Sequence, residues 1–138
     1  MPISKRVRQF LVDTYLSYLQ QGFDTGDFTP IYEFLSDDCE FCSYPEEYIL
    51  DKKSDVVGWL SGLGKEIANG RASYDVVIGP IEPFRVNGYL VDNFENVGLY
   101  DKTCETIFYI RISQSGMIQA IGFWKPLVFE VPIDVKEK

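Results

Sequence analysis

The beginning of the chain shows apolar residues at helical spacing. From Ser4 onward they recur at three- and four-residue steps, which places them on one face of a helix. Gly22 follows the last of them, and a glycine at this place can adopt the left-handed conformation that ends a helix. The pattern predicts a long helix that ends near Gln21 and Gly22, and its apolar face carries Val7, Phe10, Leu11, Tyr15, Tyr18 and Leu19.

Two further helices are predicted before residue 70. Thr29-Pro30 is a typical helix start, because a threonine side chain can cap free amides and proline loses nothing at the first helical position. A later helix, with Ser54 as its N-cap, carries Val56, Val57, Trp59, Leu60, Leu63 and Ile67. Its three glycines, Gly58, Gly62 and Gly64, each weaken helix propensity by about 1 kcal/mol relative to alanine. This helix must therefore be held by packing, or its backbone must approach another group closely.

The remaining pattern indicates strands. Residues 39–44 alternate in polarity, and everything after Gly70 is typical of an antiparallel meander. Asn87-Gly88 is a strong hairpin signal, since both residues tolerate the positive φ of a type I′ turn. The expected later strands are 89–100, 105–113 and 117–124. Helices followed by a meander predict an α+β fold, in which three N-terminal helices pack on a strongly curved, mostly antiparallel sheet. The mouth of such a cone suits a small molecule.

Composition narrows the choice of partner and compartment. A length of 138 residues fits one domain, 1–138, and the formal net charge of −8 disfavours nucleic acid and acidic membrane surfaces. The three cysteines are an odd number, and the chain has neither a signal-like start nor an apolar run of membrane-spanning length. We expect a reduced, cytoplasmic protein.

Two features of the composition bear on chemistry. The chain contains no histidine, so the commonest general base and metal ligand is missing. Aromatic residues are abundant, with 10 Phe, 9 Tyr and 2 Trp, which is more than a minimal core needs. Such an excess indicates an apolar cavity or an interface.

One pair of segments carries a resemblance to a known family. The first is Leu11-Val12-Asp13-Thr14-Tyr15-Leu16 with the break at 22–27, and the second is Phe34-Leu35-Ser36-Asp37-Asp38-Cys39-Glu40-Phe41. Together they resemble the nuclear transport factor 2-like superfamily, which includes ketosteroid isomerases, scytalone dehydratases and SnoaL-type cyclases. The resemblance covers nearly the whole chain and implies a cone-shaped, cystatin-like roll that forms a homodimer. This scaffold hosts enzymes, binding modules and assembly domains alike.

The resemblance transfers little of the family's catalytic machinery. Tyr15 matches the oxyanion-hole tyrosine of the isomerases, but Ser43 stands where they have their aspartate base. Phe108 stands where they place a protonated acid. Dehydratase chemistry of the scytalone type depends on histidines, which this chain lacks. A cyclase would need an acidic base, for which only Glu95 and its neighbours are substitutes.

Glu95 is the carboxylate to weigh most carefully. In the predicted strand 89–100, alternation puts Asn93 and Glu95 on one face, and this face is expected to line the cone. Burial would then raise the pKa of Glu95 toward neutrality, as acid or base catalysis requires. The alternative is a solvated face or a dimer interface, with Glu95 paired to Arg111 or Lys125.

Cys39-Glu40-Phe41-Cys42 has the C-x-x-C spacing but lies on a predicted strand, where its two thiols face opposite sides. Redox activity and zinc binding need features that are missing here, so buried inert thiols are expected. Asp37-Asp38 is typical of a turn rather than of a metal site. We expect no cofactor and no metal ion.

The favoured hypothesis is a homodimeric protein that binds a small apolar or aromatic molecule and contacts neither nucleic acid nor membrane. An isomerase, cyclase or dehydratase acting on a polyketide- or steroid-like substrate remains open, with Tyr15 as hydrogen-bond donor and Glu95 as base. A protein-interaction or dimerisation module is the third alternative. The expected ligand-binding residues are Tyr15, Tyr18, Trp59, Asn93, Glu95, Phe108 and Phe123.

Overall fold

The computed structural model describes residues 3–44, 48–81, 84–86, 89–91, 95–101 and 106–124. Three helices precede most of the strands: α1 (Lys5–Thr25), α2 (Thr29–Tyr32) and α3 (Lys53–Ala68). The strands are β1 (Leu35–Tyr44), β2 (Tyr48–Leu50), β3 (Val76–Pro80), β4 (Phe84–Val86), β5 (Tyr89–Val91), β6 (Val97–Asp101), β7 (Thr106–Ile112) and β8 (Ile118–Trp124). The predicted α+β class, with helices packed on a curved sheet, is confirmed.

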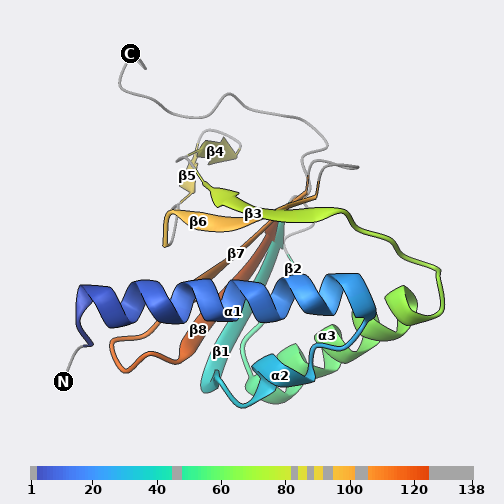
Figure 1. The fold of residues 1–138 in the computed structure, drawn as a ribbon, viewed down its shortest axis with the longest axis horizontal. Coiled ribbons are helices and arrows are strands. Elements are labelled where there is room, and N and C mark those ends of the chain that lie inside the picture. Colours follow the sequence, from blue (N-terminus) through green and yellow to red (C-terminus); the bar gives the residue numbers. More distant parts are fainter. Residues whose placement is uncertain are drawn as a thin grey trace.

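Six of these strands form one sheet in the order β2-β1-β8-β7-β6-β3, and β4 pairs with β5 in a separate hairpin. Neighbouring strands are antiparallel, except for β1 and β8, which run parallel. Figure 1 shows α1 extended beside β3 and crossing β1, β7 and β8, while α3 lies beside β1. The direction of the strands turns strongly from β1 to β3, which produces the curvature (Figure 1).

Alternation along the strands sends one set of side chains inward, toward the helices. Phe41, Phe108, Ile110 and Ile121 lie on this inner face and are buried. The register confirms the grouping, because Phe108 pairs with Phe123 and Ile110 pairs with Ile121 across β7 and β8. From the helices, Val12, Leu16, Leu19, Phe23, Val56 and Leu60 complete the core.

Helices α1 and α3 approach each other at two glycines. Gly26 follows α1 with a φ of 87°, a left-handed conformation that glycine adopts without strain. A Cβ built on Gly64 of α3 would stand 2.2 Å from the carbonyl oxygen of Gly26. Gly64 therefore allows the backbones of the two helices to touch. This agrees with one of the two alternatives given above for the α3 glycines, namely a close approach of the backbone to another group.

The position of the first helix end was predicted wrongly. Gly22 lies inside α1, where a Cβ would stand 2.1 Å from the Phe28 ring, so it is needed for packing rather than for ending the helix. The chain continues in helical conformation to Thr25, and Gly26 ends it. The sequence could not show which of the two glycines the Phe28 ring would contact.

The predicted strand 89–100 is also corrected. It is two strands, β5 and β6, and the segment before β6 contains a turn at Glu95 and Asn96, with Asn96 at a φ of 65°. Glu95 is therefore not part of a strand whose alternation could aim it into the cone. Asn93, the other polar residue predicted on that face, lies outside the described residues. The hairpin signal is confirmed by the pairing of Val86 with Tyr89 on either side of Asn87-Gly88.

Candidate ligand-binding site

A groove lies along one side of α3, and we call it the α3 groove. It encloses a volume of about 350 Å³ and is open to solvent. This is near the lower end of the volumes found for small-molecule sites. Its lining residues are Gly58, Trp59, Gly62, Leu63 and Glu66.

The helical period explains why these residues share one side of α3. Gly58, Gly62 and Glu66 follow one another at four-residue steps, and Trp59 and Leu63 form the adjacent row. Val56, Leu60 and Gly64 lie on the buried side of the same helix. The groove therefore lies where α3 turns from the core toward solvent.

The wall of the groove is continuous with the aromatic part of the core. The Trp59 ring lies 4.1 Å from that of Phe41 and 6.1 Å from that of Phe123, measured between ring centroids. Phe123 in turn contacts Phe108 at 4.8 Å, and Phe108 contacts Phe23 at 4.3 Å. Three of the predicted ligand-binding residues, Trp59, Phe108 and Phe123, are thus brought together. Only Trp59 among them lines the groove.

Gly58 and Gly62 differ from Gly64 in their surroundings. A Cβ added to either of them would meet no atom of the described residues within 4 Å, whereas one on Gly64 would collide with Gly26. Glycine costs up to about 1 kcal/mol relative to alanine in an exposed helix. No contact within the fold explains that cost at Gly58 and Gly62, and both residues line the groove.

Tyr15 is buried and lies away from the groove. Its hydroxyl donates a hydrogen bond of 2.5 Å to the carbonyl oxygen of Gly116, in the turn between β7 and β8. Its ring packs against Phe34, with 5.2 Å between the centroids. Burial, with a smaller contribution from Tyr18, raises the pKa of Tyr15 above its usual value. The hydrogen bond of the Tyr15 hydroxyl thus connects α1 to the turn between β7 and β8.

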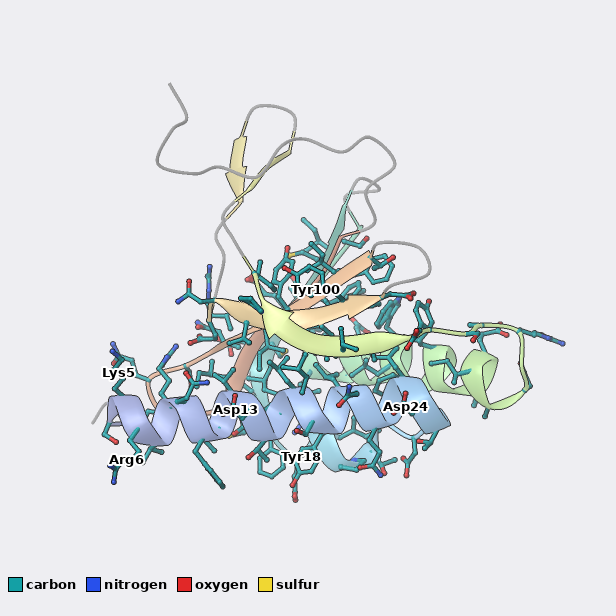
Figure 2. The ribbon with its side chains drawn as sticks, turned by 45° about the horizontal axis from the view of Figure 1, so that its top comes forward. Lys5, Arg6, Asp13, Tyr18, Asp24 and Tyr100 are labelled. Carbon is teal, nitrogen blue, oxygen red and sulfur yellow. The ribbon has the colours of Figure 1, made fainter. Side chains whose placement is uncertain are left out.

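Tyr18 lies about one turn after Tyr15 on α1. It is partly buried, and its ring is stacked on Phe34 with 6.0 Å between centroids. Figure 2 shows the side chain on the side of α1 away from β3. Tyr15, Tyr18 and Phe34 thus form a second aromatic group, separate from the one around Trp59.

Glu95 is held by the first helix. Arg8 donates to both of its carboxylate oxygens, with Nε to Oε1 at 2.9 Å and Nη2 to Oε2 at 2.7 Å. The amide of Ile112 donates to Oε2 at 3.1 Å, and Arg8 also bonds the Ile112 carbonyl at 2.9 Å. The predicted partners were Arg111 and Lys125, so the observed pair with Arg8 corrects that expectation.

Three polar side chains are buried, and two of them, Asp101 and Thr106, were not expected to be. Asp101 is 1 % exposed, Thr106 is 0 % exposed and Ser43 is 7 % exposed. Asp101 pairs with Thr106 across β6 and β7, and its Oδ1 accepts a hydrogen bond from the amide of Asp75 at 3.2 Å. Because aspartate is typical of turns, the sequence predicted a turn beginning at Asp101 and missed its burial.

The cysteines match the expectation for β1, but Asp37 and Asp38 lie inside this strand and not in the turn that was predicted for them. Cys39 is buried and Cys42 partly exposed, and their places on one strand send them to opposite faces. Burial, aided by Asp38 and Glu40, raises the pKa of Cys39 to about 12, which keeps its thiol protonated at neutral pH. Among the described residues no group of three His, Cys, Asp or Glu side chains is arranged to hold a metal ion. No helix in the described part of the chain is long and apolar enough to cross a membrane.

Comparison with solved structures identifies the architecture. An NTF-2 like protein of unknown function from Burkholderia xenovorans is similar over 91% of this chain and 90% of its own, with a TM-score of 0.52 and 10% identity. AusH from Aspergillus nidulans matches over 94% of this chain and 93% of its own, with a TM-score of 0.52 and 16% identity. The chain therefore shares a nuclear transport factor 2-like fold with these proteins.

A third neighbour with this fold is an enzyme. The epoxide hydrolase/cyclase-like enzyme SalBIII, from pyran ring formation in the polyether salinomycin, matches 90% of this chain and 94% of its own. Its TM-score is 0.51 and its identity 9%. No protein-family model matches the sequence, and no curated protein matches it either. At these identities the nuclear transport factor 2-like fold is what the neighbours share with this chain.

Proposed function

We propose that this protein binds a small molecule with an apolar or aromatic body, and that the α3 groove holds it. The observation that carries the proposal is the groove itself, at about 350 Å³ and backed by the half-buried Trp59 ring. An indole that packs on Phe41 with one part and lines a groove with another offers a rigid apolar surface. The fold supports the proposal in general terms, because its sheet and helices leave concave surfaces that suit ligands.

The predicted enzymatic alternative receives less support from the geometry. It needs Tyr15 as hydrogen-bond donor and Glu95 as base toward a common substrate. Tyr15 donates to Gly116, and Glu95 is bound by Arg8 and by the amide of Ile112. Both groups therefore have structural partners, and neither lines the α3 groove.

The test fills the groove without disturbing the core. Gly62→Leu places a good helix-forming side chain in open space, so the protein should keep its stability. Lys65→Leu is the matched control, because Lys65 is exposed on α3 but does not line the groove. Binding of 3-phenylpropan-1-ol is measured by tryptophan fluorescence and calorimetry, and native mass spectrometry identifies co-purifying small molecules.

We expect the wild type and Lys65→Leu to bind equally, and Gly62→Leu to bind about tenfold more weakly or worse, a loss of roughly 1.4 kcal/mol. Equal binding by Gly62→Leu would show that the ligand does not bind in the α3 groove. A wild-type protein that does not bind 3-phenylpropan-1-ol and carries no co-purifying molecule would contradict the proposal altogether.

Self-association is a second part of the proposal, which the fold family suggests. From the sequence, the alternate strand faces that bear Tyr109, Arg111, Phe94 and Trp124 are expected to need cover from a partner. Tyr109 is only 2 % exposed in the single chain, and its ring lies across Gly122. A dimer would therefore have to use other outer-face residues, and sedimentation velocity at micromolar concentration tests whether it forms. Phe94 lies outside the described residues.

A further inference from the structure

The polar end of the α3 groove is formed by Glu66. As a whole its side chain is 47 % exposed, yet its Oε2 atom is shielded from solvent and has no hydrogen-bond partner in the described part of the chain. Among the described residues it pairs with Arg71, whose Nη1 lies 3.9 Å from Oε2, beyond hydrogen-bonding distance. Arg71 itself is 76 % exposed, so this contact is a weak surface pairing. A shielded carboxylate oxygen without a donor is costly, and a positively charged donor would remove that cost.

The apolar end of the groove is formed by Trp59. An indole face attracts cations as well as apolar groups, because its π-system is electron-rich. Trp59 and Glu66 are seven residues apart on the same side of α3, which corresponds to about 10 Å along the helix axis. Leu63 lies between them, and Gly58 and Gly62 keep the adjacent row free of side chains.

These features bear on the charge of the ligand. The inference drawn from them rests on the proposed function. We propose that the α3 groove selects a small organic ammonium ion, whose apolar or aromatic body lies along Trp59 and Leu63 and whose protonated nitrogen donates to Glu66. The formal net charge of −8 favours the approach of such a cation. An anionic ligand of the same shape would be repelled by Glu66.

The experiment compares three probes that differ only at one end: protonated 3-phenylpropan-1-amine, neutral 3-phenylpropan-1-ol and anionic 3-phenylpropanoate. Binding is followed by fluorescence of Trp59 in a Trp124→Phe background, because the chain has two tryptophans. Glu66→Gln removes the charge at the site. Glu40→Gln is the control for net charge, since Glu40 is exposed on β1 and alternates with inward-facing Cys39 and Phe41.

We expect the wild type and Glu40→Gln to bind the amine at least about fivefold more tightly than the alcohol, and the carboxylate least. In Glu66→Gln the amine and the alcohol should bind equally. Arg71→Ala should strengthen amine binding, because it removes the competing guanidinium. Added salt should weaken binding of the amine but not of the alcohol.

Each of the following outcomes would overturn the ammonium proposal. If the wild type binds the amine and the alcohol equally, the ammonium proposal is overturned while the proposed apolar binding site stands. If the preference for the amine survives Glu66→Gln, Glu66 is not its source and the proposal is equally overturned. If none of the probes binds, the ammonium proposal fails, and the co-purification experiment above judges the proposed function separately.

Discussion

Two regions of the molecule use polar groups in opposite ways. The first, which we call the polar clasp, consists of Arg8, Tyr15, Glu95 and Gly116, and its donors and acceptors bind one another. The second is the α3 groove, where an oxygen of Glu66 lacks a partner and two glycines border open space. Satisfied polar groups join elements of a fold, whereas a buried polar group without a partner needs an explanation outside the contacts of the fold. By this difference we assign the residues of the polar clasp to the stability of the fold and the residues of the α3 groove to the proposed binding site.

The clasp shows why a buried tyrosine at this place does not by itself imply catalysis. The Tyr15 hydroxyl bonds the turn between β7 and β8. Arg8 and Glu95 add a bidentate ion pair between α1 and the turn before β6. Together these contacts fix the first half of α1 to the sheet.

The largest effect is expected at the crossing of α1 and α3. Gly64→Ala places a Cβ 2.2 Å from the Gly26 carbonyl oxygen, a backbone atom that cannot move aside without separating the helices. We expect the free energy of unfolding to fall by about 3 kcal/mol, as for other overpacked sites. Urea denaturation measures it, and an unchanged midpoint would mean that the two helices do not touch as described.

The next largest effect is expected from the clasp ion pair. Glu95→Gln leaves the Arg8 guanidinium without its charged partner and should lower the free energy of unfolding by about 2 kcal/mol. Glu40→Gln, on an exposed carboxylate, is the control and should change little. A double-mutant cycle with Arg8→Met isolates the coupling between Arg8 and Glu95. An additive cycle would show that the pair contributes nothing.

The Tyr15 hydroxyl gives a smaller effect. Tyr15→Phe leaves the carbonyl oxygen of Gly116 without its donor and should cost about 1–2 kcal/mol of stability, with probe binding at the α3 groove unchanged. Tyr18→Phe is the matched control, because Figure 2 shows Tyr18 on the side of α1 away from β3. If Tyr15→Phe lost binding but kept its stability, the phenol would belong to the site rather than to the fold.

The smallest effect has the opposite sign. Gly62→Ala should raise the free energy of unfolding by up to about 1 kcal/mol, because alanine favours the helix and its methyl group meets no atom. The same methyl group narrows the groove, so probe affinity should decrease as stability increases. Gly58→Ala should behave in the same way. A variant that is more stable and binds the probe equally well would show that these glycines do not belong to the binding site.

Local pattern was enough to predict the helices and much of the sheet. Apolar spacing predicted α1 and α3, and Phe108 and Phe123, which were among the expected ligand-binding residues, pair across β7 and β8 and contact each other. Short-range signals failed where two candidates compete, as at Gly22 and Gly26. There the choice depended on Phe28, which packs against Gly22 from beyond the end of the helix.

The sequence by itself determined the α+β architecture, the aromatic wall and the absence of histidine chemistry, since period and composition are local properties of the chain. Only the tertiary structure decided that Glu95 binds Arg8 and that Tyr15 binds Gly116, because these partners lie 87 and 101 residues apart. The same holds for the three glycines of α3. In the sequence they are equivalent, and only the position of α1 shows that Gly64 is required by packing while Gly58 and Gly62 border a groove.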